Sequence, residues 1–226
     1  NRTRGFVKVQ DGCDNRCAYC LTQVARGRST STPPENVIAY ANKLRNLGVK
    51  EIILTGVQLG SWGKDLSPRL SFASLVGLIL AQTDIERIRL SSIEPWDVTA
   101  ELIGLFENPR LCPHLHIPLQ SGSDEVLRKM SRPGSIANFR DILAMIREQK
   151  SHFAVTTDII CGFPGETDEH FQQSLDFVEA CQFSGGHVFP FSELKGTAAF
   201  GMEGQVKHSI RKDRTVLVRK LLDESE

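Results

Sequence analysis

Three cysteines, Cys13, Cys17 and Cys20, are spaced C-x3-C-x2-C within the segment GCDNRCAYC. In a reducing compartment, clustered cysteines are more often metal ligands or redox groups than disulfides. A structural zinc ion takes four ligands, and neither a second C-x2-C pair nor a histidine pair lies near enough to complete the set. Two interpretations remain. One is a catalytic zinc ion with three protein ligands, and the other is a four-iron cluster with one iron open to a small molecule that carries an amine and a carboxylate.

The chain contains three further cysteines outside this segment. Cys112, Cys161 and Cys181 lie at unrelated spacings within predicted core elements. Since a cysteine that binds nothing behaves as a small hydrophobic residue, we interpret these three as buried core residues and not as a second set of ligands.

Length and composition predict one large globular domain. The chain has 226 residues, of which 40% are hydrophobic and 24% charged, and its formal net charge is zero. No stretch approaches 18 uncharged apolar residues, and the first 20 residues contain no apolar signal-peptide core, so we expect a cytoplasmic protein without a membrane span. Residues 1–28 carry six basic side chains and two aspartates, a small patch compatible with a phosphate-bearing partner or with ordinary solvated charge.

Short apolar or β-branched runs alternate with longer amphipathic stretches along the chain. The predicted strands are residues 6–10, 51–56, 87–92, 114–120, 154–162 and 186–192. The predicted helices are residues 33–47, 71–82, 97–107, 123–130, 135–149, 167–180 and 207–223. Thr32 is the predicted N-cap of the first helix, with Pro33 in its first turn, and Thr167 is the predicted N-cap of the helix near residue 167.

Six strands that alternate with helices imply right-handed crossovers, and therefore a parallel sheet with helices outside. A doubly wound open sheet and a complete or partial barrel both fit this α/β pattern, and both place functional residues at the carboxyl ends of the strands. Five of these ends are rich in Gly, Ser, Glu and Gln, and the cysteine segment follows the first strand. Turn formation explains any one of these loops, whereas all of them together indicate one functional rim.

The C-x3-C-x2-C spacing with an aromatic residue, Tyr19, before the last cysteine resembles the signature of the radical S-adenosylmethionine (SAM) enzymes. The resemblance implies a 4Fe-4S cluster held by Cys13, Cys17 and Cys20, with SAM at the open iron and no catalytic residues beyond the cluster ligands. An external electron donor would reduce the cluster, and cleavage of SAM would give a 5′-deoxyadenosyl radical. The implied fold is a partial (β/α)6 TIM-like barrel, in agreement with the six predicted units.

Six segments between residues 6 and 197 resemble, in order and spacing, the methylthiotransferases that modify tRNA or a ribosomal protein. They are VQDGCDNRCAYCLTQVARGRSTS, EIILTGVQLGSWG, RIRLSSIEP, LHIPLQSGSDEVLRKMSR, DIICGFPGET and HVFPFSELKGT. TGVQLGSWG and RLSSIEP look most like the branch that acts at carbon 2 of threonylcarbamoyladenosine beside the tRNA anticodon. The isopentenyladenosine and ribosomal-protein branches are alternatives within the family, and a zinc-dependent RNA-binding module is the alternative from a different class.

Complete members of the resembled family also carry an amino-terminal domain with a second cluster and a carboxy-terminal RNA-binding module. Neither matches a segment of this sequence, so residues 1–226 are expected to be a single radical SAM core domain. Sulfur insertion would then need the missing domains. Because the net charge is zero, binding to the anticodon stem-loop of tRNA is expected to be weak for this segment alone.

Five residues at or after the ends of the second, third and fourth predicted strands are candidates for binding SAM. Gly56 would let the chain approach the methionine amine, with an ordinary turn glycine as the alternative. Ser92 and Glu94 would bind ribose hydroxyls or, alternatively, cap the helix near residue 97. Gln120 ends the fourth strand, and Arg132 would pair with the SAM carboxylate unless it is a solvated arginine at a helix end.

The segment DIICGFPGE resembles the adenine-binding segment of the superfamily. This implies that the backbone near Ile160 and Gly162 contacts the base, and that Phe189 or Phe191 of the sixth strand forms an apolar wall. Strand phenylalanines are more often core residues, and only Phe189 is kept as a candidate for the cofactor site.

Overall fold

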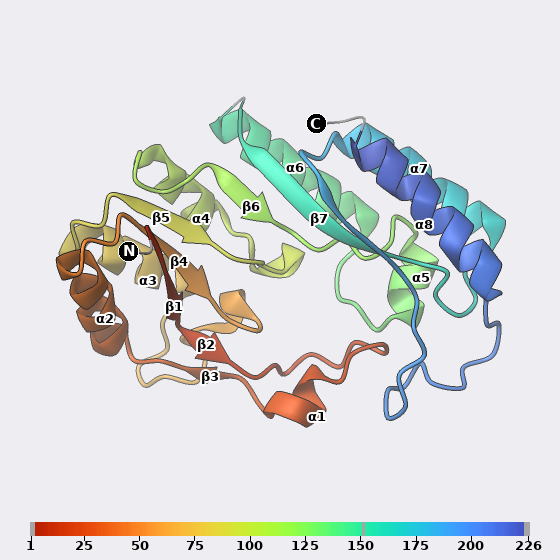
Figure 1. Cartoon of the computed structure of the whole chain (residues 1–226), viewed down its shortest axis with the longest axis horizontal. Helices are drawn as coiled ribbons and strands as arrows, with labels where there is room; N and C mark the ends of the chain where they lie inside the picture. Colours follow the sequence, from red (N-terminus) through yellow and green to blue (C-terminus); the bar gives the residue numbers. More distant parts are fainter. Residues whose placement is uncertain (1–2, 151, 224–226) are drawn as a thin grey trace. The chain divides into compact units, whose positions relative to one another are not determined.

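The computed structural model describes residues 3–150 and 152–223 (Figure 1). Their contacts divide the chain into two compact units. The first contains the described residues of 1–14, 22–116 and 145–153, and the second those of 15–21, 117–144 and 154–226. Within the described part of the chain, no helix is both long and apolar enough to cross a membrane.

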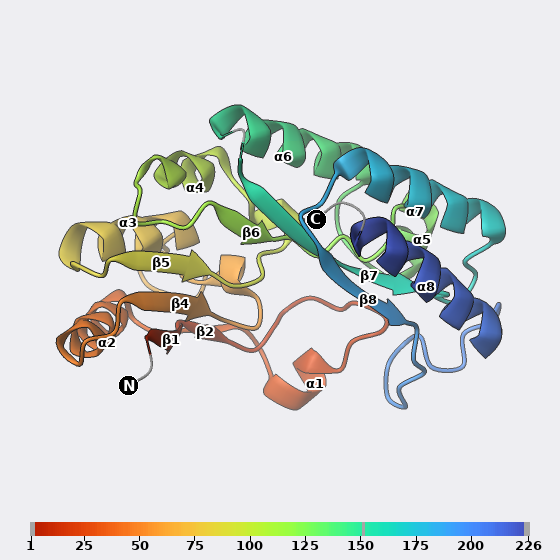
Figure 2. The same ribbon diagram turned by 45° about the horizontal axis from the view of Figure 1, so that its top comes forward.

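The first unit is built on a parallel sheet in the order β1-β4-β5. β1 (Arg4–Lys8) pairs with the central strand β4 (Glu51–Thr55), which in turn pairs with β5 (Arg87–Leu90). Parallel bridges, including Ser92 to His116, continue from β5 toward β6 (His114–His116). Figure 2 shows β1, β4 and β5 side by side, so the loops that follow them leave from the same end.

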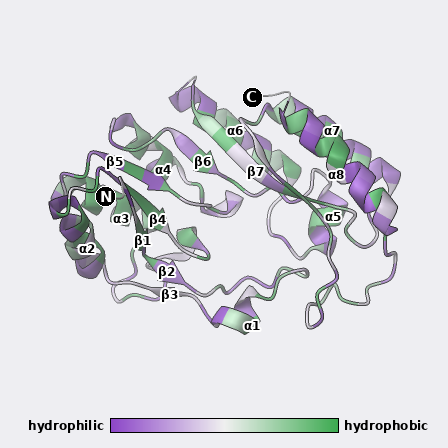
Figure 3. Cartoon of the chain, viewed as in Figure 1, coloured by the Kyte–Doolittle hydropathy of each residue, from purple (hydrophilic) through white to green (hydrophobic). Residues whose placement is uncertain are grey.

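Amphipathic helices cover this sheet. α2 (Pro34–Asn46) packs against β1 and against α3 (Phe72–Gln82), and α3 contacts α4 (Ala100–Gly104). Figure 3 shows hydrophobic colour along β4, whereas α2 alternates between hydrophobic and hydrophilic residues. The apolar stripe of each helix can therefore be buried while its polar face meets solvent. Three short 3-10 helices, η1 (Leu59–Ser61), η2 (Pro95–Asp97) and η3 (Leu105–Glu107), lie in the connections.

The second unit is built around β7 (Ala154–Cys161), which pairs in parallel with β8 (Gly186–Pro190). On the other side of β7, the segment 117–120 forms backbone hydrogen bonds that run from Ile117 N to Thr156 O and from Gln120 N to Asp158 O, both 2.8 Å long. Side chains of β7 alternate between buried and half-buried positions, as the period of two in its sequence predicts.

The remaining helices are α5 (Asp124–Lys129), α6 (Ile136–Gln149), α7 (Asp168–Cys181) and α8 (His208–Asp223). α7 and α8 lie side by side, and α8 also contacts β7 and β8 (Figure 1). Thr167 caps α7, since its Oγ1 accepts a hydrogen bond from His170 N at 3.2 Å and its N–H donates to His170 Nδ1 at 3.3 Å. The predicted cap at Thr167 is confirmed.

All six predicted strands are present with shifted ends, and the predicted parallel α/β arrangement is confirmed. The sequence did not predict the short antiparallel pair β2 (Gln10–Asp11) and β3 (Thr30–Ser31), nor the short helix α1 (Thr22–Arg26). The predicted cap at Thr32 is wrong. Pro33 occupies the cap position of α2 with ψ at 142°, and Thr32 N donates instead to Val9 O at 2.8 Å.

Candidate functional site

The first part of the cysteine segment, up to Asp14, belongs to the first unit and is closed at its base by β2 and β3. Cys13 N donates to Gly27 O at 3.1 Å. Gly12 has φ of +72°, and a Cβ at this position would lie 1.9 Å from Arg28 O. Only glycine fits there, because both the backbone angle and the close approach exclude a side chain.

Gln10, which is 1% exposed, connects this base to the loop after β4. Its Nε2 donates to Asp11 O and Gly12 O, both at 2.8 Å, and its Oε1 accepts from Gln58 N at 2.8 Å. A Cβ on Gly56 would lie 2.8 Å from Gln10 Oε1, so Gly56 is needed for this close approach. The predicted role of Gly56 in SAM binding stays a prediction beside this structural role. Sequence reasoning missed the roles of Gln10 and Gln58. The signal in the sequence was that each glutamine lies at or just after the end of an apolar run.

The second part of the segment, from Asn15 to Leu21, belongs to the second unit. Cys20 N donates to Cys17 O at 3.0 Å, which makes a tight turn. Between them, Ala18 is buried in a hydrophobic cluster and forms backbone hydrogen bonds to Met130 at 2.8 Å and to Ala199 at 2.7 Å. Ala18 therefore anchors the Cys17–Cys20 turn to the core of the second unit.

The donor chemistry of the segment fits a soft metal or an iron–sulfur cluster, because cysteine thiolates are the preferred ligands of both. Cys13 and Cys17 are half-buried and Cys20 is exposed. Across the residues that the structure describes, no three His, Cys, Asp or Glu side chains are gathered as ligands of a metal ion. The structure thus supplies three accessible thiols on an anchored loop, and ligation by all three together stays a prediction.

The other three cysteines are buried, as predicted. Burial raises the pKa of Cys161 to about 12, and burial also raises the pKa of Cys112. A thiol with a raised pKa stays protonated near neutral pH and is a poor metal ligand. Burial therefore makes Cys112 and Cys161 poor candidates for a second set of metal ligands.

A pocket of about 270 Å³ in the second unit brings together three of the predicted cofactor residues, Gln120, Ile160 and Phe189. Gln120 has φ of +69°, a left-handed conformation that residues other than glycine adopt rarely and often at functional sites. The full lining consists of Tyr19, Gln120, Asp158, Ile160, Phe189, Pro190, Phe191, Ser192 and Leu194. Sequence reasoning missed Asp158, the one carboxylate in this lining.

The two phenylalanines of this pocket differ in exposure. Phe189 is 50% exposed and forms part of the wall, whereas Phe191 is 4% exposed and its ring packs edge-on against Phe163 at 5.2 Å between centroids. The choice of Phe189 over Phe191 as the accessible apolar wall is consistent with this difference.

The backbone N–H groups of the predicted adenine segment already have acceptors in the protein. Ile160 N donates to Gln120 O at 2.9 Å, and Gly162 N donates to Glu166 Oε1 at 2.8 Å. Gly162 has φ of +76°, and a Cβ there would lie 2.5 Å from Arg211 Cγ. Ile160 lines the pocket and Gly162 forms a close-packed turn after β7, and contact of the backbone near these two residues with adenine stays a prediction.

Arg132 is 7% exposed, which excludes the alternative of a solvated arginine at a helix end. Its Nη2 donates to Pro118 O at 2.8 Å, and its Nη1 donates to the Tyr19 hydroxyl at 3.4 Å. The guanidinium therefore helps to hold the hydroxyl of Tyr19, a residue of the pocket wall. Pairing of Arg132 with a SAM carboxylate stays a prediction.

Ser92 and Glu94 follow β5 in the first unit. Ser92 is exposed and Glu94 is half-buried. Glu94 occupies the cap position of η2 without a capping side-chain hydrogen bond, and α4 is capped by Thr99, whose Oγ1 accepts from Leu102 N at 3.2 Å. The alternative that Ser92 and Glu94 cap the following helix is thus not supported, and ribose binding stays a prediction.

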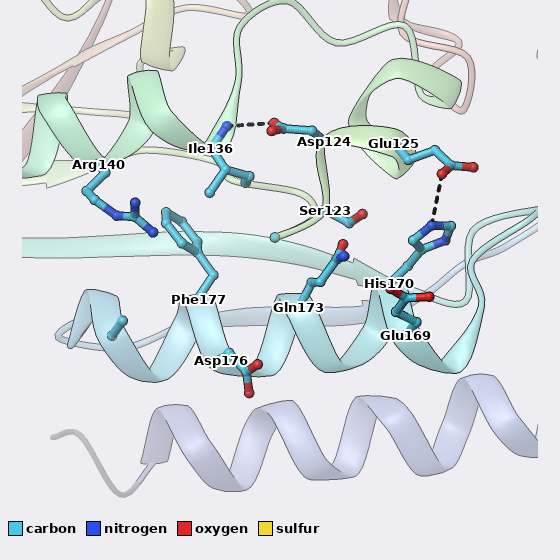
Figure 4. Close-up of a pocket in the computed structure, with 12 residues that line it drawn as sticks. Ser123, Asp124, Glu125, Ile136, Arg140, Glu169, His170, Gln173, Asp176 and Phe177 are labelled. Carbon is cyan, nitrogen blue, oxygen red and sulfur yellow. Dashed lines mark hydrogen bonds and ion pairs between the residues drawn. The ribbon is translucent and has the colours of Figure 1, made fainter.

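A second pocket, of about 590 Å³, lies among α5, α6 and α7 (Figure 4). His170 Nε2 and Glu125 Oε2 are 3.1 Å apart at one end, and the Arg140 guanidinium lies 5.6 Å from the centre of the Phe177 ring at the other. Asp124 Oδ1 accepts a hydrogen bond from Ile136 N at 2.7 Å. None of the predicted cofactor residues lines this pocket.

A buried ion pair holds the loop after β7. Glu166 Oε1 and Arg214 Nη1 of α8 are 2.6 Å apart, and their side chains are 2% and 6% exposed. Burial raises the pKa of Glu166, and the opposing effects of the Gly162 N–H and the Arg214 guanidinium do not cancel this rise. The neighbouring Arg211 lies over the Phe191 ring at 5.3 Å and donates to Phe191 O at 3.0 Å. Two arginines of α8 therefore fix the ends of the strands that line the smaller pocket.

Part of the predicted basic patch is neutralised within the first unit. Lys8 Nζ lies 2.5 Å from Asp11 Oδ2, and this hydrogen bond is the main cause of the lowered pKa of Asp11. Arg28 pairs with Asp14 at 3.4 Å. These ion pairs use the two aspartates of the patch, so the excess of cations over aspartates is the one that the sequence gives.

The family model described as the radical SAM superfamily matches residues 7–178. This chain belongs to the radical SAM superfamily. The match covers the cysteine segment and the strands β4 to β7, so the resemblance to the superfamily is confirmed.

The sequence of this radical SAM chain is also similar to those of curated tRNA methylthiotransferases. It is 47% identical to the threonylcarbamoyladenosine tRNA methylthiotransferase MtaB of Thermotoga maritima, over 100% of this chain and 52% of that protein. It is 41% identical to the MtaB of Bacillus subtilis, over 95% of this chain and 48% of that protein. It is 38% identical to the tRNA-2-methylthio-N(6)-dimethylallyladenosine synthase of Clostridium tetani, over 94% and 47% respectively. The chain thus spans about half the length of the curated relatives it matches.

Solved radical SAM structures share the fold. The methyltransferase TsrM from Kitasatospora setae, solved with cobalamin and a [4Fe-4S] cluster bound, gives a TM-score of 0.70 at 18% identity, covering 86% of this chain and 38% of that chain. Coproporphyrinogen III oxidase (HemN) from Escherichia coli gives 0.67 at 16% identity, covering 97% and 52%. The predicted partial (β/α)6 barrel of the radical SAM type is confirmed by this likeness.

Proposed function

We propose that this chain is the radical SAM core of a tRNA methylthiotransferase that acts at carbon 2 of threonylcarbamoyladenosine beside the anticodon. The observation that carries the proposal is the 47% identity to the Thermotoga maritima MtaB over the whole chain. The pocket that gathers Gln120, Ile160 and Phe189 supports it, because all three residues are candidates for SAM binding from the sequence alone.

In this proposal Cys13, Cys17 and Cys20 hold a 4Fe-4S cluster. Such a cluster, once reduced by an external electron donor, would supply the electron for cleavage of SAM to methionine and a 5′-deoxyadenosyl radical. The chain's own residues bind and orient the cofactor. Phe189 offers an apolar face to the adenosyl group, and the Asp158 carboxylate can accept hydrogen bonds from ribose hydroxyls. Ser92 and Glu94 of the first unit are further candidates for the ribose, and the anticodon stem-loop is the proposed substrate.

The anaerobically reconstituted and reduced chain is expected to convert SAM slowly to 5′-deoxyadenosine, measured by liquid chromatography. Phe189→Ala should raise the SAM concentration for half-maximal rate by about tenfold, since aromatic contacts contribute ~0.5–1.5 kcal/mol beyond their area burial. Phe200→Ala is the matched control, because Phe200 is 49% exposed and does not line the pocket. Equal effects of the two changes, or no product from a chain with an intact cluster, would contradict the proposed pocket.

The substrate branch can be tested with a chimeric protein, in which this chain replaces the matching region of the Thermotoga maritima MtaB. The chimeric protein is expected to add a methylthio group to tRNA that carries threonylcarbamoyladenosine, detected by mass spectrometry of digested tRNA. The loops after β4 and β5 carry the resemblance to this branch. Both loops lie in the exchanged region, so the chimera should keep their preference for the substrate.

Transfer RNA that carries isopentenyladenosine is the control substrate and should stay unmodified. A chimera with Cys17→Ala should modify neither tRNA. Modification of the isopentenyladenosine tRNA alone would assign the chain to the other branch.

A further inference from the structure

The thiol of Cys13 lies beside a buried side-chain amide. Cys13 Sγ is 3.3 Å from Gln58 Oε1, and the two residues are 45 positions apart in the first unit. Gln58 is 5% exposed, so its amide is largely removed from water. A sulfur atom within hydrogen-bond distance of a buried amide interacts with it strongly, since the local dielectric constant is low.

The backbone of Gln58 is fixed independently of this contact. Its N–H donates to Gln10 Oε1 at 2.8 Å, and its carbonyl accepts from Ser61 Oγ at 2.7 Å and from Ser61 N at 2.9 Å. The Cα of Gln58 is therefore fixed, and its side chain can move only by rotation about its own χ angles. Substitution of the side chain leaves all three backbone hydrogen bonds in place.

As a protonated thiol, Cys13 donates to the amide oxygen of Gln58. A cysteine that ligates a metal has lost this proton, so its sulfur can only accept a hydrogen bond. The amide oxygen of Gln58 can also only accept, so the two atoms could no longer form a hydrogen bond with each other. The oxygen and nitrogen of a glutamine amide occupy nearly the same space, and a half-turn of the amide exchanges them. After that turn Nε2 points at the sulfur.

We propose that Gln58 donates an N–H···S hydrogen bond from Nε2 to Cys13 Sγ when Cys13 ligates the cluster, and that this bond raises the reduction potential of the cluster. The inference rests on the proposed function, because it requires the cluster. Reduction adds negative charge to the cluster and its sulfur ligands, so a donor aimed at one of those sulfurs stabilises the reduced state more than the oxidised state. Gln58 is thus a positioning residue for electron uptake and need not touch the substrate.

Gln58→Met is the decisive change, because methionine has a similar length and no N–H group. The reconstituted variant is expected to keep its iron but to show a more negative midpoint potential, measured without SAM by a redox titration followed by electron paramagnetic resonance. A midpoint potential more negative by about 59 mV would lower the ratio of reduced to oxidised cluster tenfold at a fixed solution potential, since this is a one-electron couple.

Ser61→Ala is the matched control. It removes the 2.7 Å hydrogen bond to the Gln58 carbonyl while leaving the Gln58 amide intact, so it loosens the same loop without removing the donor. The potential of Ser61→Ala should stay close to that of the unchanged chain. An equal shift in both variants, or an unchanged potential in Gln58→Met, would overturn the inference.

A measurement on the unsubstituted chain covers the case in which Gln58→Met takes up no iron. Glutamine labelled with 15N at its side-chain amide should give a nitrogen coupling to the reduced cluster in pulsed electron paramagnetic resonance. Absence of this coupling in a chain that contains about four irons overturns the role of Gln58 and leaves the proposed function intact. Failure of the unsubstituted chain to bind any iron overturns both.

Discussion

Cys17→Ala is expected to abolish the iron–sulfur cluster. The reconstituted chain should contain about four irons and four sulfides, and the variant should contain almost none, because only two of the three proposed cysteine ligands would remain. The main chain around Cys17 should be unaffected, since the turn is anchored through Ala18 to Met130 and Ala199. Iron and sulfide analysis after anaerobic reconstitution measures the effect.

Cys181→Ala is the matched control for this prediction. Cys181 is buried at the end of α7 and is 4% exposed, so its removal also deletes one thiol but should leave the iron content unchanged. Stoichiometric zinc without iron in the unchanged chain would instead favour the zinc-dependent RNA-binding module. Equal loss of iron in both variants would show that the assignment of the buried cysteines is wrong.

The strand and helix pattern could be predicted from the sequence because each element repeats its apolar residues at its own period. The pocket residues Gln120, Ile160 and Phe189 could be predicted because they lie at or near the carboxyl ends of parallel strands, and such ends converge. Sequence periodicity alone did not separate Phe189 from Phe191, two residues apart. β8 ends at Pro190, so Phe191 lies beyond the strand, where its N–H donates to Cys161 O at 2.8 Å and its ring turns into the core.

Long-range polar contacts could not be predicted. Gln10 and Gln58 are 48 positions apart, and nothing local in either segment shows that one amide accepts from the backbone of the other. The same holds for Arg132, whose partners Pro118 and Tyr19 come from other segments of the second unit. These contacts satisfy buried polar groups, and their geometry depends on the assembled fold.

Arg214→Met is expected to lower the free energy of unfolding by about 3–5 kcal/mol, since removal of one partner of a buried ion pair leaves the other charge uncompensated. Arg214 contacts Glu166 at 2.6 Å, Asp168 at 2.6 Å and the Phe171 ring at 5.0 Å, and its side chain is 6% exposed. Urea denaturation of the apo chain near neutral pH measures the loss. Lys212→Met on the exposed face of α8 removes a cation of the same helix and should change stability by no more than about 0.5 kcal/mol.

The destabilisation by Arg214→Met should depend on pH. Burial already raises the pKa of Glu166 in the folded chain, and loss of the guanidinium raises it further. Folded Glu166 then binds a proton more tightly than unfolded Glu166, whose pKa is about 4.3, so the stability of the variant falls as the pH rises above that value. We expect a smaller loss at pH 5 than at pH 8, and Glu166→Gln in the same chain should recover much of the loss at pH 8. A loss independent of pH and not rescued by Glu166→Gln would mean that Arg214 acts through its packing on Phe171 and not through charge.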